Sequence, residues 1–512
     1  MPNNEFGDFQ TPLALAEKII RLFDSGTYDR ILEPTCGTGS FLQAIRKFGA
    51  REAVGVEVQP HHVTAASAFA RVIQANVFEM DLSSDLDWTS AAGPLLVVGN
   101  PPWVTSADLS RFGSANIPSK SNVKNLTGME ARTGSSNFDV AEFIWLKLIR
   151  ELQGAEPTIA LLCKTQVARN VIAFCAENRL PMDGASLYLI DSMRWFGAAV
   201  DAGLFIVKVR SAAENYVCEL YADLDADRPL RSFGMVDGKM VSDVAGYVHT
   251  NNGDGSSHLE WRQGIKHDAT QVMELIEDNG PRKKSGEPVH IEPSYLYPLL
   301  KSTDIFRART TVLSKWMVVP QRSLAESTTP LEVAAPQLWS YLGTHSAVLD
   351  GRKSSIYTRR PRFCIFGVGD YSFQPYKVAI SGMHKEPRFR LVGPIAGKPA
   401  VFDDTCYFLP FVDAAEAAIV CAVLQSRAAM TLLESLVFWD SKRPVTKKLL
   451  QRLDLSALAA MEDPFQLVIV ASELCAKAEI SPIPDAADLR IGLEALINMS
   501  SCVGSPQLAY DT

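Results

Sequence analysis

The residues that could do chemistry most directly follow an apolar run at 95–99. Four branched apolar residues lead into a glycine, and the chain continues as Asn100, Pro101, Pro102 and Trp103. Such a run predicts a buried strand, and two prolines end it abruptly in a rigid turn. The turn would hold one amide and one indole in fixed positions. The plainer alternatives are an ordinary turn begun by Asn-Pro and a core aromatic at Trp103.

A second set of candidate residues follows an earlier predicted strand. Gly37 and Gly39 come after that strand and open a helix, so the backbone could approach a ligand closely there. Glu57 ends the next strand about 20 residues later, where a doubly wound fold binds ribose hydroxyls. Any tight strand–helix turn also needs glycine, and the Gly-x-Gly-x-x-Gly dinucleotide pattern fails because position 42 is Leu.

Predicted strands and helices alternate up to about residue 210. These elements must position both sets of candidate residues. The alternation predicts an α/β, doubly wound fold, with a parallel sheet covered by helices on both faces. Ligands of such sheets bind at the carboxyl ends of the strands, where Asn100 and Glu57 both fall. The expected strands lie at 30–34, 53–58, 72–78, 95–99, 158–163, 187–191 and 202–209, and the expected helices at 39–49, 60–71, 138–152 and 166–178.

Together these motifs resemble those of the S-adenosylmethionine-dependent N6-adenine DNA methyltransferases of the gamma motif order, the TaqI-like group. In that order a Thr-Pro motif comes first, then the cofactor loop, the catalytic Asn-Pro-Pro-aromatic and, last, target recognition. The resemblance is close over roughly residues 5 to 210 and extends to general layout beyond. The matching stretches are FQTP (9–12), LEPTCGTGSF (32–41), GVEV (55–58), ANVF (75–78), GNPPW (99–103), ALLCK (160–164) and RWFGAAVDAGLFIV (194–207).

The resemblance implies a Rossmann-like methyltransferase sheet with Asn100, Pro101, Pro102 and Trp103 as catalytic residues. The Asn100 side-chain oxygen and the Pro101 carbonyl would accept from the exocyclic amine of a base. They would draw its nitrogen toward tetrahedral geometry and free the lone pair to attack the methyl group of the cofactor. This chemistry requires no metal.

The resemblance also implies stacking and cofactor-binding residues. Trp103, where the family usually has Tyr or Phe, and Phe196 would stack on an extruded base, with Trp195 as the rival to Phe196. Asn76 stands where the family often has Asp, and its carbonyl oxygen could accept from the cofactor's adenine amine. The expected S-adenosylmethionine-binding residues are Thr11, Pro12, Glu33, Thr35, Gly37, Gly39, Glu57, Asn76 and Val77.

The remaining chain divides by composition. The polar segment 104–137 is too long for an ordinary connection and favours a loop over the active site that orders on DNA, against a mobile surface loop. The implied parts are a catalytic domain at 1–212, a β-rich extension and linker at 213–260, an α+β target-recognition domain at 261–455, and a C-terminal helical segment with a flexible tail at 456–512.

A local basic stretch lies within the predicted target-recognition domain. Residues 351–390 hold nine Lys or Arg against one Asp and one Glu, with Tyr and Phe interleaved, in a chain of net charge −8. This pattern is typical of a phosphate-binding face, and its alternative is a solvated strand edge. The predicted DNA-binding residues are Arg352, Lys353, Arg359, Arg360, Arg362, Lys377 and Lys385.

Bulk properties favour a cytoplasmic protein with ample length for a large core. Hydrophobic residues make up 47% and charged residues 21%, which is ordinary for a globular protein. The nine cysteines include no Cys-x-x-Cys pair and read as reduced, mostly buried thiols. The N-terminus has no signal pattern, and no apolar stretch approaches the ~18 residues that span a bilayer.

Three other functions share parts of the pattern. N4-cytosine methylation uses the same geometry, although Asn at position 100 rather than Ser favours adenine. Glutamine methyltransferases of proteins also carry Asn-Pro-Pro and an aromatic, but they tend to be smaller. A DNA-binding module without activity is the third alternative. The expected partners are double-stranded DNA and a separate cognate restriction endonuclease, because the chain contains no Glu-x-Lys triplet for a fused nuclease.

Overall fold

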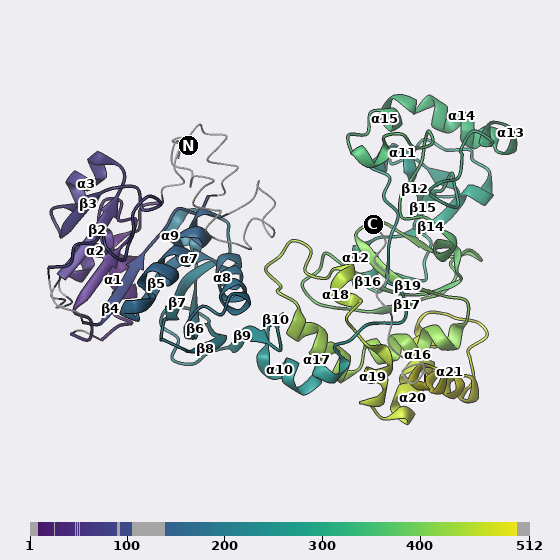
Figure 1. The fold of residues 1–512 in the computed structure, drawn as a ribbon. Coiled ribbons are helices and arrows are strands. Elements are labelled where there is room, and N and C mark those ends of the chain that lie inside the picture. The colour runs from purple at the N-terminus through teal and green to yellow at the C-terminus, as the bar shows by residue number, and fades with distance from the viewer. Residues whose placement is uncertain are drawn as a thin grey trace. The chain divides into compact units, whose positions relative to one another are not determined.

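The chain folds into two compact units, residues 1–245 and 246–512, in a computed structural model (Figure 1). The predicted loop at 104–137 lies outside the described residues, apart from Val104, and so does the tail that follows Ser501. The structure describes residues 9–24, 26–46, 48, 50, 52–89, 93–104 and 139–498.

The first unit is built on a ten-stranded sheet, which confirms the α/β, Rossmann-like fold class. Its strand order is β10-β9-β8-β6-β7-β5-β4-β1-β2-β3, and the five strands from β3 to β5 run parallel. The strands are β1 (Arg30–Glu33), β2 (Glu52–Glu57), β3 (Arg71–Gln74), β4 (Leu95–Gly99), β5 (Thr158–Lys164), β6 (Met182–Ile190), β7 (Ala202–Lys208), β8 (Glu214–Tyr221), β9 (Arg231–Val236) and β10 (Lys239–Val241).

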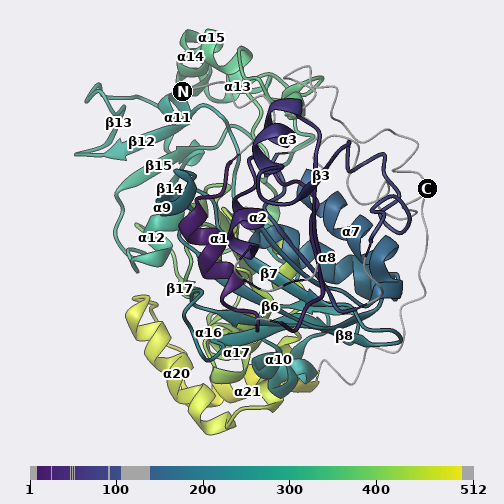
Figure 2. The same ribbon diagram turned by 90° about the vertical axis from the view of Figure 1, so that its left-hand side faces the viewer.

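Helices cover both faces of this sheet. Leu96 and Val98 of β4 pack with Leu15 and Ile19 of α1 on one face, and α7 and α8 lie on the other (Figure 2). Every residue of β4 is buried, as expected for a strand covered on both sides. The helices are α1 (Leu13–Ile20), α2 (Ser40–Ile45), α3 (Pro60–Ala66), α7 (Val140–Leu152), α8 (Thr165–Glu177) and α9 (Ser192–Phe196).

Two features of the sheet differ from the sequence prediction. β7 runs antiparallel to both β5 and β6, so the sheet is not purely parallel. The connection from β6 to β7 spans only residues 191–201, whereas a parallel crossover needs about a dozen residues or more. The sheet also continues through β8, β9 and β10, so the first unit extends past residue 212 to 245.

The second unit combines two mostly antiparallel sheets with helices. One sheet has the order β11-β19-β16-β17 and the other β13-β12-β15-β14-β18. The strands are β11 (Arg262–Gln263), β12 (Glu274–Glu277), β13 (Pro281–Arg282), β14 (Leu296–Leu300), β15 (Lys315–Val318), β16 (Tyr376–Ser381), β17 (Arg390–Val392), β18 (Val401–Phe402) and β19 (Cys406–Phe411).

The C-terminal helices of the chain belong to this second unit. α16 packs against both α20 and α21, so the helices predicted after residue 456 share a core with the preceding chain. None of the described helices is by itself long and apolar enough to cross a membrane, although α16 and α17 together, bent by 60°, pass that test by length and composition. The helices are α10 (Val244–Thr250), α11 (Thr270–Met273), α12 (Ser302–Phe306), α13 (Leu331–Ala334), α14 (Pro336–Thr344), α15 (Ser346–Asp350), α16 (Ala414–Leu424), α17 (Arg427–Leu436), α18 (Lys447–Leu450), α19 (Leu455–Ala460), α20 (Pro464–Lys477) and α21 (Ala486–Asn498).

Candidate active site

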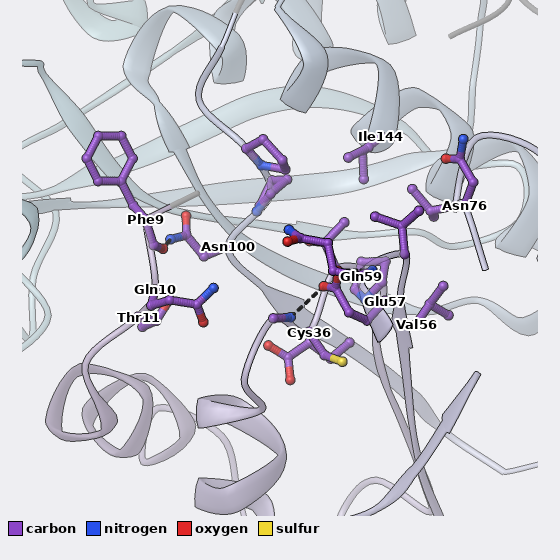
Figure 3. Close-up of a pocket in the computed structure, with 18 of the residues that line it drawn as sticks. Phe9, Gln10, Thr11, Cys36, Val56, Glu57, Gln59, Asn76, Asn100 and Ile144 are labelled. Carbon is purple, nitrogen blue, oxygen red and sulfur yellow. Dashed lines mark hydrogen bonds between the residues drawn. The ribbon is translucent and has the colours of Figure 1, made fainter. Parts of the chain in front are cut away.

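A pocket opens at the carboxyl ends of β1, β2, β3 and β4. The empty space in the pocket and at its open mouth together is about 840 Å³. Figure 3 shows Phe9, Thr11 and Asn100 on one side of it and Glu57 and Asn76 on the other. The sheet therefore brings the two predicted sets of residues to one site. The lining residues are 9–11, 33–37, 56–59, 75–78 and 100–103, with Ser40 and Ile144.

Glu57 is held at the end of β2 by backbone amides. Its Oε2 accepts from the Gly37 N–H at 2.9 Å and its Oε1 from the Gln59 N–H at 2.8 Å, and the residue is only 8% exposed. A carboxylate has about four acceptor positions, so two remain for hydroxyl groups of a ligand. Gly37 has φ +50°, a conformation that favours glycine, and an added Cβ would lie 2.6 Å from the Gln10 Oε1, so the Gln10 side chain would have to move.

Glycine is required where α2 begins. Gly39 has φ +88°, and an added Cβ would lie 3.0 Å from the Cα of Ala66. Its N–H donates to the Cys36 carbonyl at 2.8 Å, which closes the turn between β1 and α2. At Gly39 the loop therefore lies too close to the backbone of α3 for a side chain.

Glu33 is the second carboxyl group in the pocket. It is 3% exposed, and its Oε2 accepts from the Leu42 N–H at 3.3 Å. Burial raises the pKa of Glu33 well above its ordinary value; the Leu42 N–H opposes this rise and the nearby Glu57 adds to it. A positively charged ligand group in the pocket would favour the ionised form of Glu33.

The other predicted cofactor residues lie in or beside the pocket. Thr11 and Thr35 line it, and the buried Thr35 Oγ1 makes no hydrogen bond within the described part of the chain. Pro12 precedes α1, and its carbonyl accepts hydrogen bonds from the first turn of that helix. Pro12 therefore positions the start of α1 and does not line the pocket. The Asn76 Oδ1 accepts from the Phe78 N–H at 3.1 Å, and Val77 beside it is buried.

Asn100 has a fixed amide orientation. Its Nδ2 donates to the Phe9 carbonyl at 3.0 Å, and only the NH₂ end of an amide can donate, so the two ends cannot be exchanged. The Oδ1 is buried and has no hydrogen-bond partner in the described structure. Asn100, which lines the pocket, therefore keeps an acceptor oxygen whose hydrogen-bonding capacity is unused. Pro101 and Pro102 also line the pocket.

Trp103 forms an aromatic cluster with Phe9 and Phe196. Its ring centroid lies 5.1 Å from that of Phe196, at 67° between planes, and 6.0 Å from that of Phe9. Trp103 is 6% exposed, and its Nε1 donates to the Leu162 carbonyl at 3.4 Å. Phe196 rather than its rival Trp195 is thus the α9 aromatic in contact with Trp103. Trp195 lies instead beneath the guanidinium of Arg194, at 5.1 Å.

The segments that flank residues 105–138 meet at one point beside the Asn-Pro-Pro-Trp turn. The Val140 N–H, at the start of α7, donates to the Val104 carbonyl at 3.0 Å. Asp139 caps α7 through the Ala141 N–H and accepts from Lys164 Nζ at 2.8 Å. The two ends of the intervening segment are therefore joined next to Trp103 and the end of β5.

Sequence reasoning missed several residues of the pocket. Phe9 and Gln10 precede the Thr-Pro motif, and the stretch FQTP contained them without a role. Phe78 and Ile144 also line the pocket, and Phe78 packs on Phe143. Apolar residues of this kind carry no pattern that separates a pocket wall from a core. No cluster of three or more His, Cys, Asp or Glu suited to a metal occurs among the described residues.

The predicted DNA-binding residues lie in the second unit and divide into two groups. Lys353, Arg359, Arg360, Arg362 and Lys385 are exposed. Lys377 and Arg352 instead make internal contacts.

Lys377 is 1% exposed and donates to the Gln374 carbonyl, so its assignment to a phosphate-binding surface is corrected. β16 is covered on both faces, which explains the burial. Arg352 donates to the carbonyls of Leu349, His267 and Cys364, so it is a half-buried structural contact.

Comparison with known proteins places the chain in a family. No family model matches it. It is 38% identical over 467 residues to the type II methyltransferase M.NspV of Nostoc sp. (strain PCC 7524), which covers 89% of this chain and 97% of that relative. The type II methyltransferase M.CvrRI of Paramecium bursaria Chlorella virus XZ-6E is 28% identical over 118 residues, which cover 23% of this chain and 30% of that relative.

A solved structure with a similar fold is that of the type IIL restriction-modification enzyme MmeI in complex with DNA. The alignment covers 98% of this chain and 74% of the MmeI chain, at 11% identity and a TM-score of 0.49. The relationship to M.NspV is the more direct, because it combines high identity with coverage of nearly the whole of both chains. By that relationship, the chain belongs to the type II methyltransferases.

Proposed function

We propose that the chain transfers the methyl group of S-adenosylmethionine to the N6 amine of an adenine extruded from duplex DNA. The observation that carries this proposal is the buried, unpartnered Oδ1 of Asn100, whose amide is oriented by the Nδ2 hydrogen bond to the Phe9 carbonyl, in a residue that lines the same pocket as Glu57. Membership of the type II methyltransferases supports methyl transfer, with DNA as the substrate. Asn rather than Ser at position 100 favours adenine over cytosine.

The residues at the strand ends fit S-adenosylmethionine. Glu57 has two acceptor positions beyond those used by Gly37 and Gln59, which suits a pair of ribose hydroxyls. Glu33 and the unpartnered Thr35 Oγ1 suit the polar, positively charged methionine end. Val77 and Phe78 offer apolar walls to an adenine ring, beside the amide of Asn76. When bound there, the cofactor supplies an electrophilic methyl group.

Asn100 and Pro101 activate the amine. The N6 lone pair of adenine is delocalised into the ring, so the amine is a weak nucleophile. The Asn100 Oδ1 and the Pro101 carbonyl accept from its two N–H groups, and the nitrogen becomes more tetrahedral and more nucleophilic. Its lone pair would then be available to accept the methyl group that the bound cofactor supplies as its carbon–sulfur bond is given up, and one N–H proton of the amine would pass to solvent.

Trp103 and Phe196 stack on the base, which requires a movement of one ring. A base held between two rings needs about 3.5 Å on each side, or roughly 7 Å between the ring centroids. The centroids lie only 5.1 Å apart. Trp103 is anchored through Nε1 and is almost fully buried, whereas Phe196 is half-buried at the end of a five-residue helix. Phe196 is therefore the ring that moves.

In the second unit, DNA phosphates are bound by the exposed basic residues Lys353, Arg359, Arg360, Arg362 and Lys385. Their charges would contribute affinity for any duplex, whereas base contacts would supply specificity. A separate restriction endonuclease would recognise the same DNA sequence as this chain.

The decisive experiment expresses the chain in a bacterial host without other adenine methylation and sequences its DNA with detection of modified bases. N6-methyladenine at one recurring sequence is the expected result, and it must disappear with Asn100→Ala. N4-methylcytosine would replace the adenine assignment with the cytosine one. DNA without modification would contradict DNA methylation, and methylated glutamine in host proteins would then identify the remaining alternative.

A further inference from the structure

Two consecutive residues, Phe9 and Gln10, each bind a different part of the candidate site. The Phe9 carbonyl accepts from the Asn100 Nδ2 at 3.0 Å. The Gln10 Oε1 accepts from the Thr38 N–H at 3.0 Å and from the Thr38 hydroxyl at 2.9 Å. The first contact reaches the catalytic turn after β4, and the second reaches the glycine loop after β1. A single peptide link separates the two.

Gln10 lies directly on the loop that Glu57 also holds. A Cβ at Gly37 would stand 2.6 Å from the Gln10 Oε1, and the Gly37 N–H donates to Glu57 at 2.9 Å. Figure 3 shows Gln10 beside Thr11, on the same side of the pocket as Asn100. Any ligand that displaces or tightens this loop therefore acts on Gln10.

Phe9 connects to the aromatic cluster as well as to Asn100. Its ring centroid lies 6.0 Å from that of Trp103 and 6.2 Å from that of Phe196. The residue whose carbonyl orients the Asn100 amide thus also packs on both proposed stacking rings. A shift of Phe9 would move the acceptor and the stacking faces together.

We propose that Phe9 and Gln10 are positioning residues that couple the cofactor loop to the orientation of Asn100. An occupied loop holds Gln10, Gln10 holds Phe9 in place, and the Phe9 carbonyl holds the Asn100 Nδ2, which leaves Oδ1 as the free acceptor of the amide. Without that carbonyl the amide could rotate and present NH₂ to the amine, a donor facing a donor. This proposal rests on the proposed function and adds a route by which cofactor and base favour one another.

Thr38 offers the cleanest test, because it is absent from the pocket wall and its substitution removes no group that faces the ligand. Thr38→Val removes the hydroxyl donor to Gln10 and keeps the shape, whereas Thr38→Ser restores the hydroxyl. Gln10→Met removes the acceptor of both bonds, and Gln10→Glu retains an acceptor. The full-length protein is used throughout, with DNA carrying the sequence that it methylates.

Single-turnover methyl transfer at saturating cofactor and DNA is measured beside the affinity for S-adenosylhomocysteine. We expect Gln10→Met to slow transfer by about tenfold to a hundredfold, the order that misplacement of an organised group costs. Thr38→Val should slow it by about fivefold, and Thr38→Ser and Gln10→Glu should recover most of the rate. The affinity of Thr38→Val for S-adenosylhomocysteine should stay within about threefold of wild type.

A transfer rate unchanged in Thr38→Val and Gln10→Met would overturn the proposal, as would a loss confined to cofactor affinity. A second measurement needs no DNA and no methyl transfer. S-adenosylhomocysteine should change the fluorescence of Trp103, taken as the difference between wild type and Trp103→Phe, and Gln10→Met should abolish that change. A response retained in Gln10→Met would also overturn the coupling. If wild type shows this response but transfers no methyl group to DNA, the proposed function fails while the coupling stands.

Discussion

Glu33 and Glu57 end neighbouring strands and line one pocket, but their surroundings differ. Glu57 is held by backbone amides on both oxygens, whereas Glu33 is 3% exposed and accepts from the Leu42 N–H at 3.3 Å. One carboxylate is therefore fixed by the loop, and the other is desolvated beside it. This contrast leads to separate expectations for the two residues.

Glu57→Ala should weaken S-adenosylmethionine binding by about 2 to 4 kcal/mol, the scale of charge-assisted hydrogen bonds to two hydroxyls. Isothermal calorimetry measures this, and Glu17→Ala, at a carboxylate of α1 outside the pocket, is the matched control. Because Glu57 also holds Gly37 and Gln59, the melting temperature must be recorded beside it. An unchanged affinity for the cofactor would remove Glu57 from the site.

Glu33→Gln should make the protein relatively more stable as pH rises. The pKa of Glu33 is raised in the folded state by burial, so its contribution to stability is complete below the ordinary glutamate pKa and is lost as pH rises through the folded value. Glutamine does not titrate and avoids this loss. Melting temperatures of both proteins from pH 4 upward should therefore diverge in favour of the variant. Parallel curves would mean that Glu33 titrates normally.

Asn100→Ala should reduce methyl transfer by about a hundredfold or more, because an organised acceptor contributes on that order. Cofactor affinity should remain nearly that of wild type, since Asn100 would contact the base. Asn100→Asp is the informative companion, because it keeps acceptor oxygens but loses the donor to the Phe9 carbonyl. Turnover above about a tenth of wild type in Asn100→Ala would refute the activating role.

Reversal of Arg359 and Arg360 to Glu should weaken binding to every duplex. The slope of log affinity against log salt concentration should become shallower by about 0.9 for each phosphate that the protein no longer neutralises. Cofactor binding, which we assign to the first unit, should stay unchanged, and the melting temperature serves as the folding control for the second unit. A slope equal to that of wild type would mean that this stretch is a solvated edge.

Lys377→Met should raise the melting temperature while leaving the salt dependence of DNA binding unchanged. Burial lowers the pKa of Lys377 to about 7, so between that value and its ordinary 10.5 folding costs the loss of a proton. The stabilisation by Met should therefore be largest at pH 7 and below and should shrink toward pH 10.5. Equal melting temperatures at pH 7 would show that this lysine bears no such cost.

The motifs predicted the strand ends and the residues that meet there, because strand alternation and the rigid Asn-Pro-Pro turn are local signals. The role of Phe9 could not be predicted from the sequence, because Phe9 contacts Asn100 through its backbone carbonyl, a group that every residue has. The direction of β7 depended on a short connection and on tertiary pairing. Lys377 was misassigned because a charge count does not reveal that β16 is covered on both faces.

The hydrogen bond from the Val140 N–H to the Val104 carbonyl affects how the length of this chain can change in evolution. Because this hydrogen bond joins the two ends beside Trp103, residues can be added or removed between them without strain on the sheet. Each doubling of loop length costs only about 0.6 kcal/mol in closure entropy. This position is therefore a natural place for insertions to accumulate and for a foreign domain to be grafted, with the pairing of β4 and β5 left as it stands.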